Sequence, residues 1–153
     1  MKVSSFDAPL PFAAAPATRH VLVVESDPDQ RRRVVTQLSN WSYSPLAAGS
    51  AEEALELLGR ARFVFSLVAI RLPGLSGIDL IRRAPELSEA GPVIMVADTG
   101  HSAQIVEAIQ AGADDFIRRP YTADDLESAI RTVAGRPRRE TAAPAADDNG
   151  ERL

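Results

Sequence analysis

The sequence predicts an α/β protein with a doubly wound, five-stranded parallel sheet, and two observations carry that prediction. Apolar runs of strand length alternate five times with segments in which apolar residues recur at the helical period. Runs such as VLVV at 21–24 and PVIMV at 92–96 are apolar on both faces, which is typical of parallel strands with helices on both sides. We therefore expect five helices, connected to the strands by right-handed crossovers.

The elements follow one another in strict alternation. The strand-length runs lie at 20–25, 44–48, 65–72, 92–98 and 114–119. The segments of helical period lie at 28–41, 51–61, 77–87, 102–112 and 122–133. Residues at the helix starts support these boundaries, because Ser50 with Glu53 and Thr122 with Asp125 have the spacing of capping boxes. Pro28 suits the first position of a helix.

Length and composition restrict the function classes. The chain has 153 residues, 45% apolar and 25% charged, which suits one globular domain. It has no apolar run near the roughly 20 residues of a membrane span, and prolines interrupt its first apolar stretch, so we expect a cytoplasmic protein. The absence of cysteine and the wide separation of His20 and His101 disfavour a zinc site. The net charge of -4 disfavours general nucleic-acid binding.

The two ends of the chain differ from its middle. Residues 1–19 are rich in alanine and proline, and residues 135–153 show no apolar periodicity. Neither segment can bury enough apolar surface to offset the entropy of ordering it. We therefore expect two disordered tails around one domain at 20–134.

Polar side chains at the carboxyl ends of the strands are the first candidates for function. In doubly wound folds, ligands bind at that edge of the sheet, beside the switch in strand order. The residues that the predicted strands deliver there are Glu25, Ser26, Asp27, Ala69, Arg71, Ala97, Asp98, Arg118 and Arg119.

Five segments resemble the receiver domain of bacterial two-component response regulators, and the chemotaxis regulator in particular. In chain order they are VLVVESDPD, SAEEALELL, RLPGLSGIDLI, PVIMVAD and AIQAGADDFIRRPY. The resemblance covers about residues 20–134. It implies the flavodoxin-like receiver fold, a phosphoacceptor aspartate at the end of the third strand, and two acidic residues after the first strand that hold magnesium.

The sequence departs from that family pattern at the positions that carry the chemistry. Ala69 stands where the resemblance implies the phosphoacceptor, and Ser26 follows Glu25 where a second acidic residue is implied. Ala97 replaces a threonine or serine, Arg119 replaces a lysine, and the aromatic switch position is Phe116. Phosphoryl transfer requires a nucleophile, a metal and a cationic group. Only the cation remains, so we expect a pseudo-receiver without enzymatic activity or cofactor, in which magnesium binding is weak or absent.

Two features keep other interpretations open. Arg119 either pairs with Glu25 across the vacated pocket or binds a small anion, because a guanidinium recognises planar oxyanions. Asp27 and Asp98 lie one residue from family positions, so either one is an alternative phosphoacceptor that relays phosphate. Against that alternative, Asp27 is well placed to cap the first helix, and Asp98 begins a loop where aspartate is common.

The surface of the fourth helix, fifth strand and fifth helix is the expected interaction site, by family analogy. Most of its apolar side chains are expected in the core: Ile105, Ile109, Phe116 and Ile130. Gln104, Arg118 and Tyr121 are the candidate docking residues. The sequence thus predicts a stand-alone, phosphorylation-independent adaptor that binds a histidine kinase, another response regulator or a second copy of itself. The arginines at 31–33 are expected on a solvated helix face.

Overall fold

A computed structural model describes residues 19–100 and 102–134 of the chain. His101 and the predicted tail at 135–153 lie outside these residues. Of the predicted tail at 1–19, the structure describes Arg19 alone. Arg19 belongs to the folded part, because its guanidinium carbon lies 4.2 Å from the centre of the Tyr43 ring. Its carbonyl oxygen also accepts a hydrogen bond from the Ser44 amide at 2.8 Å. Arg19 therefore contacts the chain at the start of the second strand, through both its side chain and its backbone.

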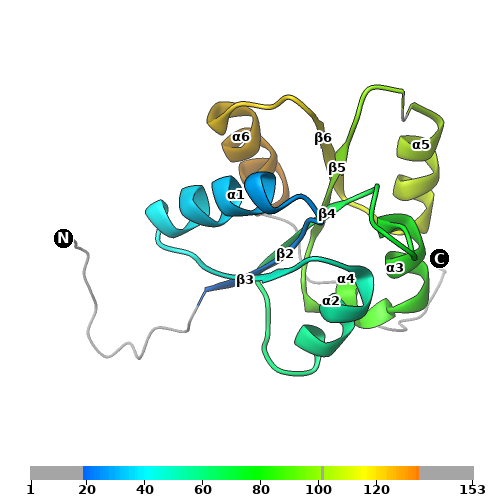
Figure 1. Ribbon diagram of the computed structural model, residues 1–153, viewed down its shortest axis with the longest axis horizontal. Coiled ribbons are helices and arrows are strands. Elements are labelled where there is room, and N and C mark those ends of the chain that lie inside the picture. The colour runs from blue at the N-terminus through cyan, green and yellow to red at the C-terminus, as the bar shows by residue number, and fades with distance from the viewer. Residues whose placement is uncertain (1–18, 101, 135–153) are drawn as a thin grey trace, which may run out of the picture.

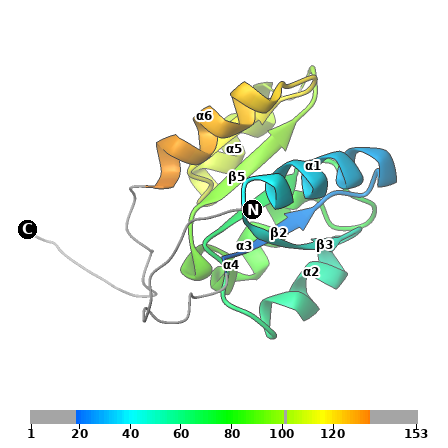
Figure 2. The same cartoon turned by 90° about the vertical axis from the view of Figure 1, so that its left-hand side faces the viewer.

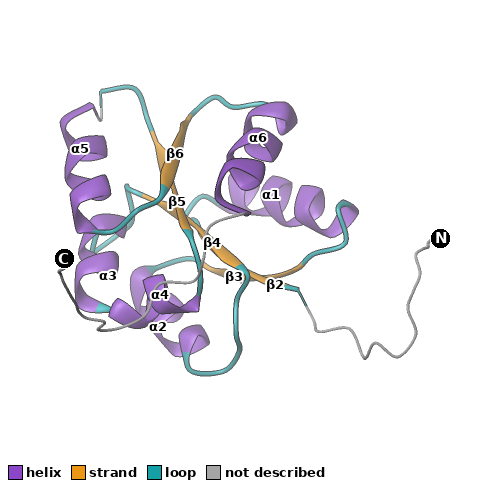
Figure 3. Cartoon of the chain, turned by 180° about the vertical axis from the view of Figure 1, so that it is seen from behind, coloured by secondary structure: helices purple, strands orange, loops and turns teal. Residues whose placement is uncertain are grey.

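The described residues form a five-stranded parallel sheet between two layers of helices, as predicted (Figures 1 and 3). The order of the strands is β3-β2-β4-β5-β6. Their bounds are β2 at His20–Val24, β3 at Ser44–Ala48, β4 at Phe65–Ala69, β5 at Val93–Ala97 and β6 at Asp115–Arg118.

Six helices occupy the crossovers among the described residues, where the sequence predicts five. Their bounds are α1 at Pro28–Asn40, α2 at Ala51–Leu58, α3 at Gly77–Arg83, α4 at Pro85–Ala90, α5 at Ser102–Ala111 and α6 at Ala123–Ala134. The expected helix at 77–87 is divided, because the residue before a proline is disfavoured in the helical region. Ala84 accordingly has φ -125° and ψ 79°, which ends α3, and α4 starts at Pro85.

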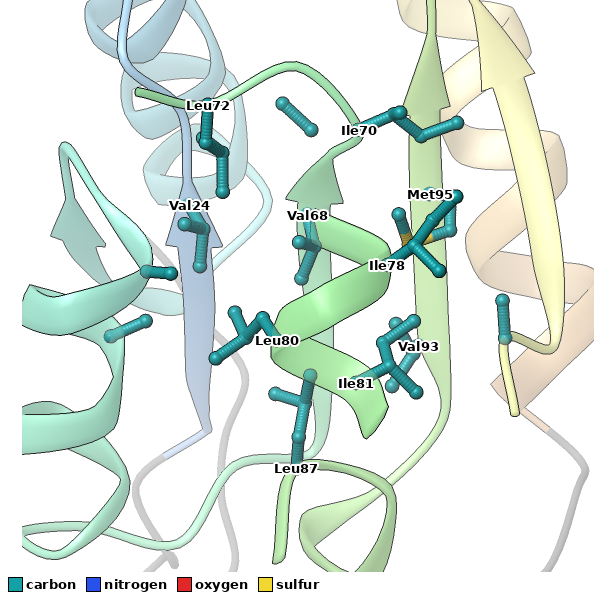
Figure 4. Close-up of a cluster of buried hydrophobic side chains, with 14 of the residues drawn as sticks. Val24, Val68, Ile70, Leu72, Ile78, Leu80, Ile81, Leu87, Val93 and Met95 are labelled. Carbon is teal, nitrogen blue, oxygen red and sulfur yellow. The ribbon is translucent and has the colours of Figure 1, made fainter. Parts of the chain in front are cut away.

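The helices divide the core into two clusters, one on each face of the sheet. Buried residues of α1 and α6 pack against one face, together with alternate residues of β2, β4 and β5. Residues of α2, α3 and α5 pack against the other face. Figure 4 shows this second cluster, in which Leu80 and Ile78 of α3 lie over Val68 and Met95. All five residues of β4 and of β5 are buried, and all of them except Ser66 are apolar, as expected of inner parallel strands.

The parallel register aligns the carboxyl ends of the inner strands. Val24 lies opposite Ala48 and Val68, and Ala69 lies opposite Val96. The loops that follow β2, β4, β5 and β6 consequently meet at one edge of the sheet. The order switches between β2 and β4, which is where ligands bind in this class of fold.

Side-chain caps fix where the helices start. Thr122 and Asp125 exchange both hydrogen bonds of the predicted capping box, each at 3.0 Å. The Ser50 hydroxyl accepts a hydrogen bond from the Glu53 amide at 3.2 Å, but the Glu53 carboxylate binds the Gly49 amide instead of completing the box. No helix among the described residues is long and apolar enough to cross a bilayer.

Candidate functional site

Four loops bring charged side chains together at the carboxyl edge of the sheet. Glu25 follows β2, Arg71 follows β4, Asp98 follows β5, and Arg119 follows β6. These are four of the residues that the sequence places at this edge. They form one network of ion pairs, described below from its centre outward.

Arg119 is the centre of the network. Its Nη2 donates to Glu25 Oε1, and its Nη1 donates to Asp98 Oδ1 at 3.0 Å. The backbone amide of Arg119 also donates to the Ala97 carbonyl at 2.8 Å. The predicted pairing of Arg119 with Glu25 is thereby confirmed. Asp98 as a second partner was missed, because its side chain reaches Arg119 only once β5 and β6 are paired.

Burial shapes the electrostatics of this pair. The Glu25 residue is only 7% exposed, and the Arg119 side chain is 19% exposed. Burial lowers the pKa of Arg119, and Tyr121 partly opposes that shift. An arginine remains a cation even after such a shift, so Arg119 neutralises Glu25 in a place where an unpaired carboxylate would be costly.

Asp98 extends the network to β4. Its Oδ2 lies 3.4 Å from Nη2 of Arg71, whose side chain is largely exposed. One carboxylate thus joins the loops after β4 and β6. Asp98 as an alternative phosphoacceptor gains no support from this geometry, because both of its oxygens face guanidinium groups.

The loop between β2 and α1 is held from two sides. Glu25 Oε2 accepts a hydrogen bond from the Asp27 amide at 3.1 Å. Arg31 Nη1 donates to the carbonyl of Glu25 at 2.8 Å. The expectation of a solvated face for residues 31–33 is therefore wrong for Arg31, which is half-buried, and right for Arg32 and Arg33, which are exposed.

Asp27 caps α1, as the sequence predicts. Its Oδ1 accepts hydrogen bonds from the amides of Asp29 at 2.9 Å and Gln30 at 3.4 Å. We expect Asp27→Ala to lower the free energy of unfolding by about 1 kcal/mol and Asp27→Asn to change it little, because asparagine also caps helices. Urea denaturation of both variants measures this; equal losses would contradict the cap.

Three small residues complete the edge of the sheet. Ala69 and Ala97 are fully buried and present only methyl groups at the ends of β4 and β5. Ser26 is half-buried after β2. Behind Ala69, the backbone of Gly77 approaches so closely that an added Cβ would overlap the Ala69 carbonyl oxygen. Positions 69 and 97 therefore supply neither a carboxylate nor a hydroxyl, and the carboxylates of Glu25 and Asp98 are both paired with Arg119.

The predicted docking residues lie on α5, β6 and the loop after β6. Gln104 and Tyr121 are half-buried, and Arg118 is exposed with its guanidinium carbon 5.9 Å from the centre of the Phe116 ring. Burial raises the pKa of the Tyr121 phenol, and Arg119 partly opposes that rise.

The exposed apolar side chains of α5 were missed. Ile105 and Ile130 are buried as predicted, and Phe116 is half-buried. Ile109 was expected in the core but is 45% exposed, and Val106 is 58% exposed. The run IVEAI leaves this open, because Ile109 is four residues from buried Ile105 and three from exposed Val106, and both spacings put residues on one helix face.

His20 has a structural environment. Its Nδ1 lies 3.3 Å from the Ser44 carbonyl oxygen, and its ring meets Phe63 edge to face. Within residues 19–100 and 102–134, no group of three or more His, Cys, Asp or Glu side chains could hold a metal ion.

A doubly wound sheet with charged loops at its carboxyl edge defines a class of α/β binding domain, and comparison with known proteins gives the family. Residues 21–131 match the response regulator receiver domain. The chain belongs to that family. Receivers of this family act in two-component signal transduction.

Curated relatives support the assignment. The chain is 33% identical over 116 residues to the chemotaxis protein CheY of Pseudomonas aeruginosa, covering 74% of this chain and 94% of CheY. It is 30% identical over 116 residues to the two-component response regulator PhoP of the same organism, covering 76% of this chain and 52% of PhoP. The chain thus spans about half the length of PhoP.

Solved structures show the same fold. A CheY-like receiver domain protein from Methanospirillum hungatei superposes with a TM-score of 0.70 at 27% identity, covering 75% of this chain and 92% of that one. NtrX from Brucella abortus superposes with a TM-score of 0.71 at 29% identity, covering 77% of this chain and 27% of NtrX.

Proposed function

We propose that this receiver domain works as a phosphorylation-independent adaptor that binds a partner protein in two-component signalling. The observation that carries the proposal is the composition of the pocket. Ala69 ends β4 with a buried methyl group, and the neighbouring cation is already bound to two carboxylates. A methyl group has no lone pair with which to attack a phosphoryl donor.

The donor set does not fit a magnesium ion. Magnesium in proteins is usually held by one or two carboxylates together with water and phosphate oxygens. Of the two carboxylates in the loop after β2, Asp27 caps α1, and both oxygens of Glu25 already accept hydrogen bonds, from Arg119 and from the Asp27 amide. We therefore expect magnesium to bind weakly or not at all.

The charge balance of the pocket also disfavours an incoming phosphoryl group. Glu25 and Asp98 together supply two negative charges, and Arg119 and Arg71 supply two positive charges. A phosphoryl group at Ala69 would have to displace a protein carboxylate from Arg119. The same balance weighs against a small-anion site framed by Glu25 and Arg119.

The partner surface follows from the exposed side chains of α5. Val106 and Ile109 add an apolar strip to the predicted docking residues Gln104 and Arg118. Exposed apolar residues beside a cation are typical of the centre of a protein interface. The expected partner is a histidine kinase or another response regulator, with a second copy of this chain as the remaining candidate.

A binding experiment with matched variants tests the proposal. The tagged chain is incubated with extract of its source cells, before and after treatment with acetyl phosphate, and the retained proteins are identified by mass spectrometry. We expect a histidine kinase or regulator to be retained equally in both conditions and to be lost with Val106→Glu and Ile109→Glu. Leu55→Glu on α2, which is also exposed, is the control and should retain it.

Two outcomes would contradict the proposal. Retention only after acetyl phosphate would show that phosphorylation controls binding. Equal loss with Leu55→Glu would show that the α5 strip is not the surface that binds the partner.

A further inference from the structure

A groove lies between α1 and α6, on the opposite face of the sheet from α5. Figure 2 shows the two helices side by side on this face. The groove has a volume of about 550 Å³, and it extends to the loops after β5 and β6. Volumes between about 300 and 1,000 Å³ are usual for small-molecule sites in proteins. The lining residues that matter here are Arg33, Val34, Pro120, Tyr121, Ala123 and Leu126.

The lining has an apolar part. Pro120 and Ala123 are exposed and Tyr121 is half-buried, whereas Val34 of α1 and Leu126 of α6 are only 5% and 1% exposed. Burial raises the pKa of Tyr121, so its phenol is neutral near pH 7. These side chains offer a surface on which a flat apolar ring can pack.

The lining also has an excess of positive charge. Asp98 borders the groove, but Arg71 and Arg119 neutralise it. Arg32 pairs with Asp29, whereas Arg33 makes no ion pair or side-chain hydrogen bond among the residues that the structure describes. Arg119 contributes a buried Nε that lacks a hydrogen-bond partner within the same residues. Arg33, as a cation in the lining without a partner among the described residues, favours an anionic ligand.

We propose that the α1–α6 groove binds a small organic anion that carries an apolar ring next to a carboxylate, sulfonate or phosphate group. The ring packs against Pro120, Tyr121 and Ala123, and the acidic group binds Arg33. The groove borders the pocket around Ala69 through Asp98 and Arg119, but Arg33 and the apolar residues that would hold the ligand lie outside that network and outside the α5 strip. It therefore goes beyond the proposed adaptor function and does not depend on it.

Two probes with the same aromatic rings, one with and one without a sulfonate group, test the site. The first is 8-anilinonaphthalene-1-sulfonate, and the second is N-phenyl-1-naphthylamine, which has the same rings without the sulfonate. We expect the sulfonate to bind one molecule per chain, at least about tenfold more tightly than the neutral probe, because charge-assisted hydrogen bonds are the strong ones. Fluorescence titration measures both affinities. Amide NMR shifts should centre on residues 30–37 and 119–126.

A matched pair of variants on one helix gives the control. Arg33→Ala should weaken sulfonate binding about tenfold and leave the neutral probe unchanged, and Arg33→Lys should restore part of the loss. Arg32→Ala should leave both affinities unchanged. Equal affinity for the two probes, equal effects of the two alanine variants, or shifts centred outside the groove would each overturn the proposal.

Discussion

Replacing Arg119 by alanine is expected to lower the free energy of unfolding by about 3 kcal/mol, because it removes the cation from the centre of a partly buried network. Glu25, at 7% exposure, would lose its cationic partner, and Asp98 would lose the partner that follows β6. This loss of stability lies at the low end of the range for breaking a buried ion pair, because the Arg119 side chain is 19% exposed and water can reach part of the vacated site. Urea denaturation at pH 7 measures the change.

The neighbouring residue provides the control for this prediction. Arg118 is exposed and its guanidinium lies over the Phe116 ring, outside the Arg119 network, so Arg118→Ala should leave the stability unchanged within error. A double-mutant cycle adds a second check. Glu25→Gln should cost clearly less in the Arg119→Ala background than in the wild type, because the charge it removes is then unpaired. Equal small effects of the two arginine substitutions would contradict the network.

Gly77→Ala is expected to destabilise the fold by about 3 kcal/mol, at the upper end for overpacking of a core. A Cβ at this position would overlap the Ala69 carbonyl oxygen and lie 3.0 Å from Met95 Cε. The Met95 side chain can move, but the carbonyl belongs to the buried end of β4. The start of α3 would have to shift away from the sheet, and the hydrogen bond from the Gly77 amide to the Ile70 carbonyl would lengthen from 2.9 Å. Thermal and urea denaturation measure the loss.

The same substitution at a second glycine is the control, because it adds a methyl group without this clash. Gly59 ends α2 with φ -82°, and a Cβ there would meet only the Glu56 carbonyl at 3.7 Å. Gly59→Ala should therefore be neutral or stabilise by up to about 1 kcal/mol, since alanine reduces the entropy of the unfolded chain. If both variants behaved alike, the close approach at Gly77 would be refuted.

The fold could be predicted because the sheet has a simple apolar pattern. Strands β4 and β5 are buried on both faces, so their residues are apolar except for Ser66, a pattern typical of inner strands in a covered parallel sheet. The division of α3 from α4 was missed although Pro85 was visible, because the residues on both sides of it kept the helical period. The backbone restriction at Ala84 outweighed that period.

The candidate site was predicted only in part, because the sequence shows where strands end but not how the loops after them bend. The ends of the strands could be read from the sequence, which placed Glu25, Asp98 and Arg119 at one edge. The pairing of Asp98 with Arg71 and the contact of Arg31 with the Glu25 carbonyl depend on how loops far apart in sequence bend toward one another. The exposure of Ile109 depends on how α5 is rotated against the sheet, and a short helix with apolar residues on two sides does not fix that rotation.

The most direct test of the central claim is an amide NMR titration of the chain with magnesium and then with beryllofluoride, a mimic of an acyl phosphate. Fluoride alone serves as the control. For an adaptor without phosphoryl chemistry, we expect unchanged signals through both additions at Glu25, Ala69, Ala97 and Arg119. Saturable shifts at these residues would contradict the account, because they would show that the pocket still accepts a phosphoryl group.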